Sequence, residues 1–196
     1  MPTTTKMGIT YPSSTDLVKD GATAMGTIST TVDSKTGLVL LNTTTFTAAA
    51  SVSLPANTFS SNYQFYYVQG IIYADSTVSI RLRASGTDNS TASSYEREFG
   101  TADANTTGAS YLADSLGDIG YSRTGEKISL EMFIYDVNLA AKTYISTKTI
   151  RPKTNMQIYT GGIIHTQAVA YDSMTFISGS GNFGTSSKVS VFGVNI

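Results

Sequence analysis

The sequence predicts an all-β fold, a jelly-roll-like antiparallel β-sandwich preceded by an N-terminal arm and a short helix. Residues 71–83 include Val78, Ile80 and Leu82 in alternation with polar residues, which is the period-two pattern of a strand with one buried face. About eight or nine such segments follow residue 38, with turn residues between them every 8–12 residues or so. Helical periodicity is absent there, as is typical of a sandwich.

Three regions are expected along the 196-residue chain. Residues 1–15 are polar and rich in Thr and Ser, and the Tyr11-Pro12 step forces an extended or turn conformation. We therefore expect an extended docking arm without a core of its own, or alternatively a frayed terminus. Residues 16–37 are expected to form a short amphipathic helix, and residues 38–196 the β-sandwich domain.

The predicted helix carries one narrow apolar stripe. The residues on the stripe fall at heptad-like spacing: Val18, Met25, Ile28 and Val32. Gly21, Gly26 and several threonines make this segment a poor helix former on its own. A weak short helix needs partners, and parallel copies of itself would supply them. The stripe therefore predicts a trimer axis; the alternative is that the helix packs on its own β-domain.

Several strand positions are also predicted from composition. Residues 63–73 form a long aromatic-rich strand in which Gly70 suggests a bulge or bend. Residues 144–150 are rich in Thr and Lys, which favours an edge strand. Residues 189–196 are almost all apolar, so we expect a strand in the interior of a sheet. Together with residues 174–177 they are expected to form a closing pair of strands joined by a Gly/Ser/Asn loop.

Composition excludes several classes of function. The net charge is −1 and no long basic run is present, which argues against nucleic-acid binding and against a polybasic membrane anchor. The chain has no Cys, so disulfides, zinc–thiolate sites and thiol nucleophiles are excluded. No window approaches the roughly 18 apolar residues of a membrane span. The start of the sequence contains no apolar signal-peptide core, so we expect synthesis in a host cytoplasm without membrane insertion.

The sequence offers no catalytic, cofactor-binding or metal-binding constellation. His165 is the only histidine, and a lone His among apolar strand residues more often packs than catalyses. No Gly-x-Ser-x-Gly motif accompanies it, and no pair of carboxylates is singled out for glycoside hydrolysis. Loop oxygens of Asp88-Asn89 or Asp103-Asn105 could ligate calcium, but this is the weaker interpretation.

Aromatic residues are a better indication of function. The chain has 12 Tyr and no Trp, and Tyr combines a flat apolar body with a polar tip that suits interfaces and stacking on sugar rings. Most Tyr residues in residues 63–73 are expected to be core or sheet-face residues. Residues 99–122 show no clear period and are expected to form an irregular insertion. In or beside it lie the three residues predicted for surface recognition: Tyr95, Tyr111 and Tyr121.

Motifs along most of the chain resemble those of tailed-bacteriophage virion proteins of the tail-fibre, minor-tail or head-fibre type. The matching segments are residues 9–16 and 20–25 at the N-terminus, and residues 42–47, 51–55, 79–89, 172–177 and 189–193 in the β-domain. The resemblance implies a C-terminal β-domain on a tail fibre, head fibre or capsid decoration, commonly trimeric, with no catalytic residues. It does not extend to residues 99–122.

These observations predict a non-enzymatic virion protein, made in the host cytoplasm. In this hypothesis a homotrimeric tail fibre or knob docks to other virion proteins through its arm and displays the β-sandwich toward a host-surface glycan or protein. The first alternative is a capsid decoration or head-fibre protein that stabilises the shell. An alternative of another class is a glycan-acting enzyme, which requires a carboxylate pair in a cleft. A bacterial adhesin is a further alternative, disfavoured by the missing signal peptide.

Overall fold

The computed structural model describes residues 21, 23, 25–29, 37–102, 107–121, 126–151 and 156–194. Residues 21, 23 and 25–29 are helical. Residues 40–194 form one compact unit, which is separate from the unit that contains the helical residues. The strands of the described residues are β1 (Leu38–Thr45), β2 (Ser51–Ser53), β3 (Phe65–Tyr73), β4 (Thr77–Ala84), β5 (Thr87–Asp88), β6 (Tyr95–Ala102), β7 (Thr107–Asp114), β8 (Gly117–Tyr121), β9 (Lys127–Tyr135), β10 (Thr143–Arg151), β11 (Gln157–His165), β12 (Ser173–Ser178) and β13 (Lys188–Val194).

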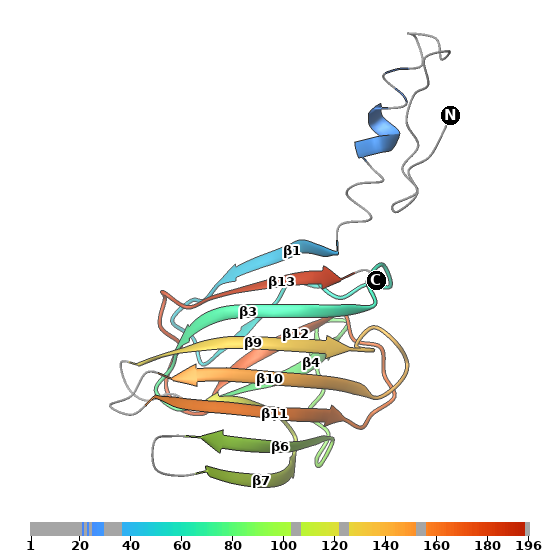
Figure 1. The fold of residues 1–196 in the computed structure, drawn as a ribbon. Helices are drawn as coiled ribbons and strands as arrows, with labels where there is room; N and C mark the ends of the chain where they lie inside the picture. Colours follow the sequence, from blue (N-terminus) through green and yellow to red (C-terminus); the bar gives the residue numbers. More distant parts are fainter. Residues whose placement is uncertain are drawn as a thin grey trace. The chain divides into compact units, whose positions relative to one another are not determined.

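The strands form two sheets (Figure 1). The larger has eight strands in the order β1-β13-β3-β9-β10-β11-β6-β7, and the smaller has five, in the order β2-β12-β4-β5 with β8 also paired to β4. Every pairing whose register is described is antiparallel. The predicted antiparallel all-β sandwich is therefore confirmed, while the jelly-roll topology stays a prediction.

One core lies between the two sheets. In β9 the alternation of exposed and buried residues is complete, and Ile128, Leu130, Met132 and Ile134 all point inward. The smaller sheet contributes Ile80 of β4 and Phe176 of β12 to the same core. Each fully buried side chain of this size stabilises the fold by about 1.5–3 kcal/mol relative to exposure. The period-two pattern thus fixes which face of each sheet is covered.

Two predicted strand positions are wrong. The segment expected at an edge, β10, lies between β9 and β11 in the middle of the larger sheet. Its threonines face inward, and Thr143, Thr147 and Thr149 are buried, so a polar composition did not mark an edge. The expected closing pair also fails, because β12 and β13 belong to different sheets and do not pair. The interior position expected for the last strand is confirmed, since β13 pairs with β1 and β3.

The stretch expected to be irregular is largely sheet. Residues 95–121 contain β6, β7 and β8, and β6 pairs with β7 over eight consecutive positions. The prediction failed because β7 is built from Gly, Ala and Ser as much as from β-formers, so no hydrophobic period marks it. β7 is a strand because it pairs with β6, and its own sequence shows no strand pattern.

Gly70 forms neither a bulge nor a bend. The β3 register runs unbroken through it against both β9 and β13. A Cβ at this position would lie 2.4 Å from the carbonyl oxygen of Lys188 and 2.9 Å from a methyl group of Val189. Glycine is therefore required here because β13 approaches the β3 backbone closely.

An ion pair joins the two sheets at the end occupied by β6 and β8. Arg97 Nη2 lies 2.7 Å from Asp118 Oδ2, and Arg97 Nη1 donates to the carbonyl oxygen of Leu116 at 3.1 Å. The Ser79 hydroxyl of β4 donates to the other oxygen of Asp118. The Arg97 and Asp118 side chains are 8% and 24% exposed, so the guanidinium is buried while the carboxylate is partly open to water. Together with Ser79, the pair links β6, β8 and β4.

Candidate functional site

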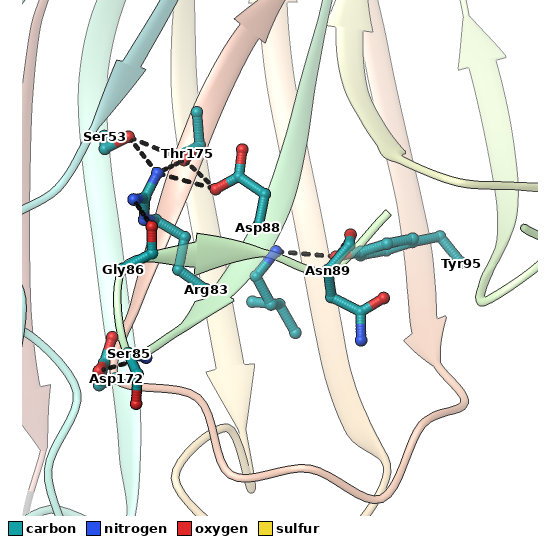
Figure 2. A network of polar contacts seen from close by, with 10 residues as sticks. Ser53, Arg83, Ser85, Gly86, Asp88, Asn89, Tyr95, Asp172 and Thr175 are labelled. Carbon is teal, nitrogen blue, oxygen red and sulfur yellow. Dashed lines mark hydrogen bonds and ion pairs between the residues drawn. The ribbon is translucent and has the colours of Figure 1, made fainter. Parts of the chain in front are cut away.

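The outer face of the smaller sheet is a closed polar network (Figure 2). The Arg83 guanidinium of β4 donates to Ser53 Oγ of β2 at 2.7 Å, to Asp88 Oδ1 of β5 at 2.9 Å and to Thr175 Oγ1 of β12 at 3.0 Å. It also donates to the carbonyl oxygen of Gly86. Because these groups bind one another, the network connects four strands. The motif at residues 79–89 thus has a structural role.

The turn between β4 and β5 completes this network. Ser85 and Gly86 have φ angles of 51° and 79° and connect the paired residues Ala84 and Thr87. Positive φ at both central residues is the hallmark of a type I′ hairpin turn. The Ser85 amide donates to Asp172 Oδ2 at 3.0 Å, as Figure 2 shows, which fixes the turn against the segment that precedes β12.

The outer face of the larger sheet carries five aromatic side chains that we call the aromatic cluster. They are Phe65 and Tyr67 of β3, Phe133 and Tyr135 of β9, and Phe192 of β13. The ring centroids lie 5.0 Å apart for Tyr67 and Phe133, and 5.3 Å apart for Phe65 and Tyr135. Tyr67 and Phe192 are 6.0 Å apart. These distances are within the range of favourable aromatic pairs.

Strand register accounts for the cluster. Phe65 lies directly opposite Tyr135, and Tyr67 lies opposite both Phe133 and Phe192. Cross-strand pairs of this kind contribute about 0.2–1 kcal/mol each. The pairing nevertheless leaves Phe133 and Tyr135 39% and 40% exposed. Large contiguous apolar patches on a protein surface typically mark contact surfaces, which makes this face a candidate for one.

The patch continues onto the neighbouring strands. Tyr144 of β10 lies opposite Tyr135, and Ile164 of β11 lies opposite Tyr144. Both are among the exposed large hydrophobic residues, at 45% and 36%. Two residues further along each strand, the outward side chains are polar. Gln69 of β3 lies opposite Ser190 of β13 on one side and opposite Glu131 of β9 on the other. Glu131 in turn lies opposite Lys148 of β10. The face is thus divided into an apolar part and a polar part.

Tyr67 connects the two parts. Its hydroxyl lies 3.5 Å from Gln69 Oε1. Partial burial, and secondarily the negative charge of Glu131, raise the pKa of Tyr67. The phenol therefore stays protonated at neutral pH, and its hydroxyl can donate or accept a hydrogen bond at the border of the aromatic cluster.

A groove of about 490 Å³ opens on the polar side. Its walls include Gln69, Ile71 and Tyr73 of β3, Glu131 of β9, and Lys188 and Ser190 of β13. Ile71 is 45% exposed. The groove therefore combines apolar surface, hydroxyl and amide groups, and one side chain of each charge.

His165 belongs to a buried polar cluster at one end of the sandwich. Its Nε2 lies 2.6 Å from the Tyr171 hydroxyl, which accepts a hydrogen bond from Asn89 Nδ2 at 2.7 Å. The His165 ring also packs on Tyr95, with centroids 4.3 Å apart. Burial lowers the pKa of His165 to about 4. The imidazole is therefore neutral at pH 7 and serves as a packed hydrogen-bonding group.

Tyr95 is not a surface recognition residue, and this prediction is wrong. It is fully buried, its hydroxyl accepts a hydrogen bond from the Leu82 amide at 2.8 Å, and it contacts the carbonyl oxygen of Asn89 at 3.2 Å. Figure 2 shows it beside Asn89. Tyr111 lies in β7 opposite Glu98, and Tyr121 lies in β8 opposite Thr77. The side chains of Tyr111 and Tyr121 are outside the described part of the chain.

Two residues of the predicted helix stripe fall within the described residues. Met25 is helical and 69% exposed, and Ile28 is helical and partly buried. Val18 and Val32 lie outside the described residues. Self-association through this stripe stays a prediction.

Sequence reasoning missed the aromatic cluster, although a signal was present. In residues 127–135 the outward phase of the alternation begins with Lys127 and Ser129 but ends with Phe133 and Tyr135. When both faces of a strand carry apolar side chains at one end, the outer face there is expected to be a contact surface as well. The corresponding partners in residues 63–73 could be identified only from the register.

The described ranges contain no group of three or more His, Cys, Asp or Glu side chains able to hold a metal ion. None of the helical residues described belongs to a helix long and apolar enough to cross a membrane. Comparisons of the chain with protein-family models, with curated proteins and with solved structures found no match. The candidate site therefore has to be interpreted from its own chemistry.

Proposed function

We propose that this protein is a non-enzymatic structural protein of a phage virion, a homotrimeric tail fibre or knob. In this proposal it docks by its N-terminal arm and displays its β-sandwich for host-surface recognition. The observation that best supports an assembling protein is the aromatic cluster, which is open to solvent on one face of the sandwich. On the opposite face, the polar side chains of the smaller sheet bind one another. We assign the aromatic cluster to contacts between copies of the chain.

The composition of the cluster favours a protein contact. Phe65, Phe133 and Phe192 have no polar tip that could bind water or a hydrophilic ligand. Aromatic residues are enriched in protein interfaces, whereas charged residues are depleted at interface centres. Two charged side chains of this face, Glu131 and Lys148, lie beside the cluster and are suited to a rim.

Assembly would serve recognition through multivalency. Three weak sites in one trimer, and several trimers on one particle, give strong overall attachment from modest single contacts. The resemblance of residues 79–89 and 172–177 to motifs of phage virion proteins supports the proposal that this assembly belongs to a particle. In the alternative hypothesis, a capsid decoration protein, the same cluster packs on the shell.

The polar groups most suited to catalysis have structural partners, which supports a non-enzymatic role. Asp88 is bound to Arg83 and Asp118 to Arg97. His165 is bound to Tyr171 in a buried position. A glycan-acting enzyme would instead hold two carboxyl groups facing a cleft.

The test is gold-labelled antibody against this protein on intact particles from the source lysate. Label confined to the tail is the expected result. Label spread over the shell would favour the decoration protein, and shell stability with and without the protein would then be compared. Particles without label would contradict the proposal.

A further inference from the structure

We infer that the groove beside the aromatic cluster binds a neutral hexose or N-acetylhexosamine unit of a cell-surface glycan. This inference rests on the proposed function and names the ligand class for its recognition step. The groove has a volume of about 490 Å³ and is open to solvent. Such a shape suits one or two units of a longer chain that continues beyond the site, rather than an enclosed small molecule.

The lining matches the two-sided chemistry of a sugar ring. A pyranose has a flat face of C–H groups and a rim of hydroxyls. Ile71 and Tyr73 supply apolar surface for the C–H face. Gln69, Glu131 and Ser190 supply amide, carboxylate and hydroxyl groups for the rim, and a carboxylate accepts especially strong hydrogen bonds.

The charges of the lining favour a neutral ligand. Glu131 and Lys188 have opposite sign, and both line the groove. Glu131 lies opposite Gln69, and Lys188 lies opposite Ile71, so that they stand on strands on either side of β3. Lys148 lies opposite Glu131 but outside the lining. Within the groove, an acidic sugar would be attracted by Lys188 but repelled by Glu131, whereas hydroxyl groups can bind both.

The groove is also poorly suited to a protein partner. Burying Glu131 and Lys188 under a protein surface would desolvate two charges, which is costly unless each finds a matching group. Sugar hydroxyls can replace the water lost from both. On the same face of the larger sheet, the aromatic cluster would therefore serve assembly and the groove would bind the ligand.

The experiment applies the purified full-length protein to an array of neutral and acidic oligosaccharides of one to six units. The strongest neutral binder is then titrated by calorimetry. Glu131→Gln keeps the shape of the side chain but loses the charged acceptor, and Ile71→Ala removes the apolar wall. Leu139→Ala, in the loop between β9 and β10, is the control, because Leu139 is also exposed, at 49%, but lies outside the groove. Light scattering verifies that the variants assemble as the wild type does.

We expect binding to neutral oligosaccharides, about tenfold or more weaker affinity for Glu131→Gln and for Ile71→Ala, and unchanged affinity for Leu139→Ala. The expected loss corresponds to one charge-assisted hydrogen bond or one buried side chain. The inference is overturned if the folded protein binds no oligosaccharide, if it prefers acidic ones, or if both groove variants bind like the wild type. Gold label on the tail in the absence of sugar binding would overturn this inference alone, leaving the proposed function intact.

Discussion

The rings of Tyr67 and Phe133 lie 5.0 Å apart on the outer face of the larger sheet, directly opposite each other in the β3–β9 register. Phe133 nevertheless remains 39% exposed. The pair is therefore part of an apolar surface that is open to solvent, and the contact between the two rings limits the rotamers of both. A rigid aromatic surface loses little conformational entropy on contact, which favours tight association.

Gly70→Ala is expected to destabilise the sandwich by about 1–3 kcal/mol, the usual cost of overpacking. The added methyl group would lie 2.4 Å from the Lys188 carbonyl oxygen, and this oxygen belongs to the backbone. Urea denaturation measures the effect. Gly162→Ala is the matched control, since Gly162 also lies within a strand but its added Cβ would meet only one atom within 4 Å, at 3.9 Å. Equal stability of the two variants would contradict the close approach of β13 to β3.

His165 is expected to make the fold less stable in mild acid. The ordinary pKa of 6.5 falls to about 4 in the folded protein because of burial, so the unfolded chain takes up a proton at higher pH than the folded one. The free energy of unfolding should therefore fall between pH 6.5 and pH 4, by about 3 kcal/mol in all, and this contribution should level off below pH 4.

Urea denaturation across this pH range, on wild type and His165→Gln, isolates the contribution of His165. The variant lacks the titrating ring, so the difference in stability between the two proteins should shrink as the pH is lowered. Parallel stability curves would show that His165 does not titrate differently in the folded and unfolded states.

Asp118→Asn is expected to lower the free energy of unfolding by about 1–3 kcal/mol. The substitution leaves the guanidinium of Arg97, which is 8% exposed, without its 2.7 Å ionic partner. Glu98→Gln is the control, because Glu98 stands exposed on β6 and its neutralisation should change stability little. A loss no greater than that of the control would mean that the ion pair does not hold β8 to β6.

Met25→Asp combined with Ile28→Asp tests the helix stripe. If the trimer requires parallel helices at its axis in addition to the aromatic cluster, two buried carboxylates per chain would separate the helices and yield soluble monomers. Sedimentation velocity gives the mass, and far-ultraviolet circular dichroism verifies that the β-domain stays folded. A variant that remains fully oligomeric would place the interface on the β-domain alone.

The sequence predicted the strands that carry strong alternation, such as residues 128–134, because burial of one face imposes that pattern. It did not predict β7, whose small residues carry no pattern, or the separation of β12 from β13, because strand order depends on non-local pairing. Tyr95 was misplaced for a similar reason. Its hydroxyl accepts a hydrogen bond from the Leu82 amide and its ring packs on His165, which is distant in the sequence.

The candidate site was only partly predictable. The individual aromatic residues of residues 63–73 were visible as sheet-face candidates, but the cluster exists only when β13, β3 and β9 are aligned in register. The groove likewise joins Glu131 to Lys188 across a long separation in sequence. Spacing in the sequence could not have predicted that these residues lie together.

The most direct test of the central claim is the mass in solution of wild type and Phe133→Asp, measured by sedimentation equilibrium over a range of concentrations. Leu139→Asp, which adds the same charge at an exposed apolar residue outside the cluster, is the control. We predict that wild type and Leu139→Asp sediment as trimers and that Phe133→Asp shifts to folded monomers at the same concentration. A monomeric wild type, or a Phe133→Asp variant as oligomeric as the control, would contradict the assignment of the aromatic cluster to contacts between copies.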